Sequence, residues 1–146
     1  MHMPLDDLTA MITRLNPPTL PDTSNAGYSQ ISIAEPGALA FVSGQVASHP
    51  DGLLVPRDIG EQTALVTKKA GAALDALGAT TSDVVLVRAY VVDLTPERLE
   101  QFMAPFLEFL DGARPSLTGI GVAALAGPDL QVEIEMTVRL PNWIAL

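Results

Sequence analysis

The distribution of hydrophobic and polar residues along the chain predicts several strands and two helices. Strand-like runs, rich in β-branched residues or bounded by turn residues, lie at 30–34, 38–46, 83–93, 117–125 and 130–140. Between the second and third runs, apolar residues recur at three- and four-residue steps over 58–77, which is the spacing of one face of a helix. A further helix is predicted over 95–110. Turn sequences such as Glu35-Pro36-Gly37 and Gly127-Pro128-Asp129 separate neighbouring strands.

Start and stop signals support both helices. Asp58 can accept hydrogen bonds from the first turn of the first helix, and Gly78 is a suitable residue to end it. Thr95-Pro96 combines a capping side chain with proline at the first helical position, which opens the second helix. Pro105 should kink or shorten the last turns of that helix, because proline lacks the N–H that the helix needs.

The predicted order is ββ–α–β–α–ββ. Two helices on one face of a mostly antiparallel sheet form a two-layer α+β sandwich. With 146 residues the chain can build one hydrophobic core, and we assign a single domain to 25–146. Residues 1–24, with a proline cluster, are expected to form a short helix or arm and a linker. Met11 and Leu15, together with Leu8, have helical spacing in this segment.

The last predicted strand has two unequal faces. Glu133 and Glu135 alternate with Val132, Ile134 and Met136, so both carboxylates lie on one face and the apolar side chains on the other. With both helices on one side, the other side of the sheet stays uncovered. We therefore expect self-association with closed symmetry.

Composition restricts the partners. Lys and Arg number 8 against 17 Asp and Glu, a net charge of −9, which disfavours nucleic acid and anionic membranes. The chain has no cysteine, and its two histidines, His2 and His49, lie in the arm and in a turn. We therefore expect no metal, no cofactor and no Ser-His-Asp triad. With no signal-like start and no apolar run of membrane-spanning length, a cytoplasmic location is expected.

Several short strings, in order and with nearly the right spacing, resemble the RidA family of reactive intermediate/imine deaminases, also called the YjgF or L-PSP family. The resemblance covers Tyr28 to about Leu140. Its strings are Tyr28-Ser29-Gln30, Ser43-Gly44-Gln45, Val92-Asp93-Leu94, Pro115 with Val122-Ala123 and Leu125, and Val132-Glu133-Ile134-Glu135.

The resemblance implies a chorismate-mutase-like fold and a homotrimer with small-molecule clefts between subunits. Active family members hydrolyse imines and enamines to 2-keto acids and ammonia. An arginine holds the substrate carboxylate, and a glutamate, here Glu133, handles the attacking water. Leu117 occupies the position of that arginine. An isobutyl group cannot form the two charge-assisted hydrogen bonds of a guanidinium, so we do not expect the usual 2-imino acids as substrates.

Other residues complete the predicted site. Tyr28 and Ser43 offer hydroxyls to a ligand or to water, although they also suit a core-edge tyrosine and a serine that ends a strand. Gly44, Thr118 and Gly119 can present backbone N–H groups to a developing negative charge, although glycines near 119 can equally mark a bulge.

Charged residues on the same strands leave alternatives open. Arg88 is the one basic residue of an otherwise apolar strand, and it either replaces the missing clamp or pairs with Glu133 or Glu135. Glu133 is either the catalytic carboxylate or a structural one, solvated or paired with Arg139 or Arg88.

Three functions follow from these residues. The first is an imine or enamine deaminase of altered specificity. The second is a non-catalytic binder of small carbonyl metabolites. The third is a scaffold or chaperone-like trimer.

Overall fold

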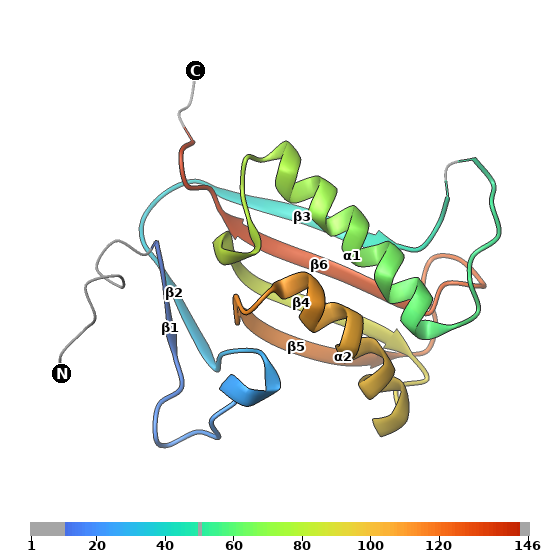
Figure 1. The fold of residues 1–146 in the computed structure, drawn as a ribbon, viewed down its shortest axis with the longest axis horizontal. Helices are drawn as coiled ribbons and strands as arrows, with labels where there is room; N and C mark the ends of the chain where they lie inside the picture. Colours follow the sequence, from blue (N-terminus) through green and yellow to red (C-terminus); the bar gives the residue numbers. More distant parts are fainter. Residues whose placement is uncertain (1–10, 50, 144–146) are drawn as a thin grey trace.

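The structure is a computed structural model that describes residues 11–49 and 51–143. A four-stranded sheet has the order β3 (Leu39–Val46), β6 (Val132–Arg139), β4 (Val84–Val92) and β5 (Ser116–Val122). β6 runs antiparallel to both β3 and β4, whereas β4 and β5 run parallel, so the sheet is mixed. Helices α1 (Ile59–Ala76) and α2 (Pro96–Leu110) cover the same face of it (Figure 1). The predicted two-layer α+β architecture is confirmed.

Both helices begin where the sequence predicts. The Asp58 carboxylate accepts hydrogen bonds from the backbone N–H groups of Gly60 and Glu61, at 2.6 and 3.2 Å, and Thr95 caps α2 by accepting from the N–H of Arg98. Gly78, with φ of +64°, follows α1 in the left-handed region that favours glycine. In the described residues, neither helix is long and apolar enough to cross a membrane.

Pro105 lies inside α2 without shortening it, contrary to one of the two outcomes expected for this proline. The helix continues to Leu110. Phe106 and Leu110, which follow Pro105, are buried in the core. Their burial holds the last turn against the loss of one backbone hydrogen bond at the proline.

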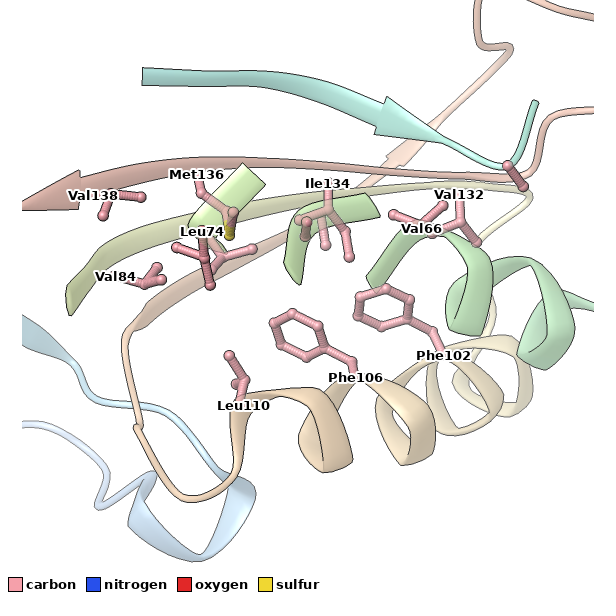
Figure 2. Packing of buried hydrophobic residues seen from close by; sticks show 14 of the residues in the cluster. Val66, Leu74, Val84, Phe102, Phe106, Leu110, Val132, Ile134, Met136 and Val138 are labelled. Carbon is pink, nitrogen blue, oxygen red and sulfur yellow. The ribbon is translucent and has the colours of Figure 1, made fainter. Parts of the chain in front are cut away.

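The core lies between the sheet and the two helices. Val132, Ile134, Met136 and Val138 of β6 alternate toward the helices, and α2 sends Phe102 and Phe106 toward them (Figure 2). The two phenyl rings stack with centroids 5.0 Å apart. Consequently Glu133 and Glu135 share the opposite, helix-free face of the sheet, as the alternation in the sequence predicts.

A separate two-stranded ribbon corrects the prediction for the N-terminal segment. Ile12–Leu15 form strand β1, antiparallel to β2 (Ile31–Ala34), with Ile12 opposite Ala34 and Leu15 opposite Ile31. The helical spacing of Met11 and Leu15 is therefore misleading, because this segment pairs with β2, its Ile12 side chain is buried and Arg14 forms hydrogen bonds to distant residues. Residues 1–10 of the expected arm lie outside the described residues.

The ribbon also separates two strands that are neighbours in sequence. β2 pairs with β1, whereas β3, which follows the Glu35-Pro36-Gly37 turn, pairs with β6 in the larger sheet. The described residues also include two short 3-10 turns, η2 (Ser24–Ala26) before β2 and η3 (Thr81–Asp83) before β4.

Arg14 fastens the ribbon to the main sheet. Its guanidinium donates hydrogen bonds to the hydroxyl of Ser32, at 2.9 Å, and to the backbone carbonyl of Val84, at 2.6 Å. Burial lowers the pKa of Arg14 to about 10, partly offset by the charge of Asp83. A buried guanidinium that lost these hydrogen bonds would pay a desolvation cost without compensation. The contacts of Arg14 therefore hold β1 in a defined position against the main sheet.

We predict that Arg14→Met lowers the free energy of unfolding by about 2 kcal/mol, the range for hydrogen bonds that involve a charged group. Urea unfolding of wild type and variant at one protein concentration measures the difference. The matched control is Arg57→Met, since Arg57 is exposed. Equal destabilisation by the two substitutions would show that Arg14 does not hold the ribbon.

Candidate functional site

A pocket of about 390 Å³ lies on the helix side of the sheet, between β4, β5, α2 and the η2 turn. Three residues that the sequence proposes for the site, Tyr28, Leu117 and Gly119, line it. The remaining lining residues are Ala26, Ala89, Val91, Leu94, Leu99, Phe102 and Met103. The sequence did not indicate that Leu99, Phe102 and Met103, which belong to α2, would line this pocket.

Strand register produces the hollow. Val87 lies opposite Leu117 and Ala89 opposite Gly119 in the parallel β4–β5 pair. Because Ala89 and Gly119 are both small, the sheet has little side-chain volume at this point. Leu99 and Met103 of α2 border the space above it. The pocket is thus a gap in the packing between two layers, placed where the sheet edge meets solvent.

The opposite face of the sheet carries a charged cluster. Arg88 and Glu135 lie opposite each other in register, with Arg88 Nη1 3.8 Å from Glu135 Oε1. The Tyr90 hydroxyl donates a hydrogen bond to the same carboxylate oxygen. The cluster pairs Arg88 with Glu135, one of the two carboxylates that the sequence suggests, and not with Glu133. Within one chain, Arg88 therefore lies on the other side of the sheet from Leu117 and its pocket.

Glu133 rests against a β-bulge in β3. The β3–β6 register passes from Val42 opposite Met136 to Gln45 opposite Ile134, so Ser43 and Gly44 together face one residue of β6. A Cβ on Gly44 would lie 1.9 Å from Glu133 Oε1. Glycine at this position is therefore what allows the carboxylate to lie directly over the β3 backbone. A glycine inside a strand was the signal for this bulge.

Arg139 does not pair with Glu133. It is buried, and its guanidinium donates to the backbone carbonyls of Glu35, Pro36 and Leu140 at 3.1, 2.6 and 2.6 Å. That arrangement supports the turn before β3 and removes one structural explanation for Glu133.

The residues proposed from the sequence thus form two separate groups in one chain. Tyr28, Leu117 and Gly119 line the pocket near edge strand β5. Ser43, Gly44 and Glu133 lie on the helix-free face toward β3, the other edge. Thr118 is exposed and lies opposite Arg88 in register, on that same helix-free face. One copy of the chain does not bring the two groups together.

The described residues contain no group of three or more His, Asp or Glu side chains placed to hold a metal ion. The Glu135 carboxylate instead takes part in one ion pair with Arg88 and one hydrogen bond from Tyr90.

Comparison with known proteins places this geometry in a family. The family described as endoribonuclease L-PSP matches residues 20–140, most of the chain. The Escherichia coli RutC family protein YjgH is 37% identical over 108 residues, which are 73% of this chain and 79% of YjgH. The chain belongs to the RidA (YjgF, L-PSP) family.

Two solved structures have the same fold. The conserved Rid family protein YyfB from Yersinia pestis, of unknown function, is 36% identical with a TM-score of 0.83, over 89% of this chain and 99% of YyfB. Escherichia coli TdcF, solved with bound serine, is 24% identical with a TM-score of 0.63, over 77% of this chain and 87% of TdcF. The second comparison concerns the fold alone.

The hydrogen bond between Tyr90 and Glu135 on this RidA-family sheet should make the stability of the protein depend on pH. The hydrogen bond to Glu135 is the main cause that raises the pKa of Tyr90 above its ordinary value of 10.0. Because the bond needs the protonated phenol, its contribution to stability is present below pH 10 and is lost as the pH rises through the raised value.

The protein has two tyrosines, Tyr28 and Tyr90. We expect a spectrophotometric titration of phenolate absorbance to show a component above pH 10 that disappears in Tyr90→Phe and moves to lower pH in Glu135→Gln. An unchanged titration curve in Glu135→Gln would mean that the hydrogen bond does not form in solution.

Proposed function

We propose that this RidA-family chain hydrolyses an imine or enamine that lacks the usual carboxylate, in clefts formed between subunits of a homotrimer. The observation that carries the proposal is the division of the candidate residues. Glu133 and its bulge lie on one sheet face near β3, and the uncharged pocket with Leu117 lies on the other face near β5. A complete site therefore needs two copies of the chain.

The sheet geometry favours a ring. Because the two half-sites are different surfaces at opposite edges, joining them between copies is a heterologous contact, and such contacts close into rings when the rotation allows. The helix-free face also supports association. Phe41 is 75% exposed and Leu39 is 47% exposed there, and exposed apolar patches of this kind commonly mark interfaces.

The proposed chemistry needs only water and the imine. The Glu133 carboxylate accepts a proton from water while the water oxygen bonds to the imine carbon, and this proton passes to the imine nitrogen, which gives a neutral carbinolamine. Glu133 then transfers the proton of the carbinolamine hydroxyl to the nitrogen, the C–N bond breaks, ammonia leaves, and the carbinolamine oxygen becomes the carbonyl of the product. Tyr28, Ser43 and the backbone N–H groups of Gly44, Thr118 and Gly119 would orient the substrate and stabilise developing charge.

The choice of substrate depends on residue 117. In the family, an arginine at the matching position holds the substrate carboxylate, and this chain has leucine. Leu117 lines the pocket and packs partly against the core. Of the described residues that line the pocket, none is charged, so a carboxylate placed there would lose its hydration without a compensating partner.

Binding without turnover is the second candidate. It is favoured by the mainly apolar lining of the pocket, which resembles a ligand-binding site more closely than a proton-transfer site. The two candidate functions differ in their need for Glu133, because only hydrolysis requires its carboxylate.

We predict that wild type accelerates ammonia release from imines produced in situ from simple amines by an amine oxidase. Glu133→Gln should lower this rate 10²- to 10⁴-fold, the usual contribution of a general base. The matched control, Glu108→Gln, changes an exposed carboxylate of α2 and should leave the rate unchanged. Full activity in Glu133→Gln would make Glu133 structural, and binding without any turnover would support the second candidate.

The same assay tests residue 117 with 2-imino acids produced by an amino-acid oxidase. We expect little acceleration by wild type and a gain of about tenfold or more in Leu117→Arg, because a charge-assisted hydrogen bond contributes about 1.5–3 kcal/mol. If wild type is already active on 2-imino acids, another group holds the carboxylate and the interpretation of Leu117 is wrong.

We predict that sedimentation at micromolar concentration gives three times the chain mass of 15.4 kDa. Phe41→Glu should dissociate the assembly, because it places a charge in the proposed apolar contact. The control Leu54→Glu makes the same change at a side chain that is 93% exposed in the loop before α1. A monomeric wild type would leave the half-sites apart and would overturn the shared cleft.

A further inference from the structure

We propose that the pocket beside Leu117 binds an apolar group of the substrate, an aliphatic chain or a small ring, and that Gly119 sets how large this group can be. This inference rests on the proposed function, since it names the substrate class of the same cleft. All residues that line the pocket come from one chain, so ligand binding to the pocket can be measured separately from turnover.

The lining of the pocket is the first argument. Tyr28 is the one polar side chain among the described residues that line it, and Leu94, Leu99, Met103 and Leu117 provide aliphatic walls. Apolar surface of this kind is stabilised by contact with an apolar ligand, and one hydroxyl at the side suffices to orient a polar end.

The size of the pocket is the second argument. Its volume is about 390 Å³, whereas an apolar cavity of about 150 Å³ is known to hold benzene. A Cβ built on Gly119 meets no atom within 4 Å. The space next to Gly119 is therefore open, and a larger side chain at this position would enter it without a clash.

Met103 offers a direct reporter of occupancy. It lines the pocket, whereas Met136 is buried in the core on β6. With methyl-¹³C-methionine in the full-length protein, a ligand in the pocket changes the Met103 signal and leaves the Met136 signal in place. Loss of one signal in Met103→Leu assigns it.

The probes are methyl ketones from 2-butanone to 2-octanone, which are neutral carbonyl compounds of increasing apolar length. We expect the Met103 signal to shift on titration, with affinity rising about fourfold per added methylene until the pocket is full. The carboxylate analogue 2-oxohexanoate should bind at least tenfold more weakly than 2-hexanone, because the pocket provides no charged partner.

Gly119→Val should weaken binding of 2-hexanone at least tenfold, since the valine side chain occupies the volume of two or more methylenes. Gly71→Ala is the matched control, because a Cβ on Gly71 of α1 makes only an ordinary contact of 3.8 Å with Phe109, away from the pocket. It should leave ketone affinity unchanged.

The outcomes separate this inference from the proposed function. Length-dependent binding without imine hydrolysis supports the apolar pocket and overturns the hydrolase. Imine hydrolysis with a flat length dependence and an unmoved Met103 signal supports the hydrolase and overturns the apolar pocket. A Met103 signal that responds to no ketone in wild type but responds in Phe41→Glu would show that a side chain of a neighbouring copy fills the pocket, which also overturns the inference.

Discussion

Burial of one face of β4 and β6 beneath the two helices is the constraint on which the rest of the structure depends. Val132, Ile134, Met136 and Val138 pack against α1 and α2, and they are almost completely buried (Figure 2). Because side chains in a strand alternate, this burial also determines that Glu133 and Glu135 face the other way. A shift of one residue in the register would exchange the two faces and bury both carboxylates in the core.

The candidate site contains two interruptions of this regular packing. On the helix side, Gly119 lies opposite Ala89, and the missing side-chain volume leaves the pocket beneath α2. On the opposite side, the bulge at Ser43 and Gly44 interrupts the β3–β6 ladder and lets the Glu133 carboxylate lie against the backbone. Both interruptions depend on glycine, which is expected where packing must be left incomplete or a side chain must approach the backbone closely.

The two interruptions lie on opposite faces and near opposite edges of one sheet, and this separation supports the proposal that catalysis depends on assembly. Glu133 does not line the pocket, and the pocket has an apolar surface but no carboxylate. In the proposed ring, each subunit contributes a carboxylate to one cleft and a pocket to another. Substitution of a pocket residue would then affect a cleft whose carboxylate belongs to a neighbouring chain.

The sequence by itself determined the helices, the strands of the main sheet and the facing of Glu133, because caps, prolines and period-two alternation act over a few residues. The strings around Tyr28, Ser43 and Glu133 also indicated the family. Alternation and local spacing could not show that Ile12–Leu15 form a strand, or that β2 pairs outside the sheet that β3 joins. Those outcomes depend on contacts distant in sequence, such as Arg14 with the carbonyl of Val84.

The pocket and the bulge were likewise decided only by the tertiary structure. Gly119 and Ala89 leave a cavity because a parallel register of β4 and β5 places them side by side, and Gly44 matters because Glu133 lies over it. A sequence lists the small residues, but it does not state which other residue each one faces. That pairing is set by the packing of the whole domain, and the division of the candidate site follows from it.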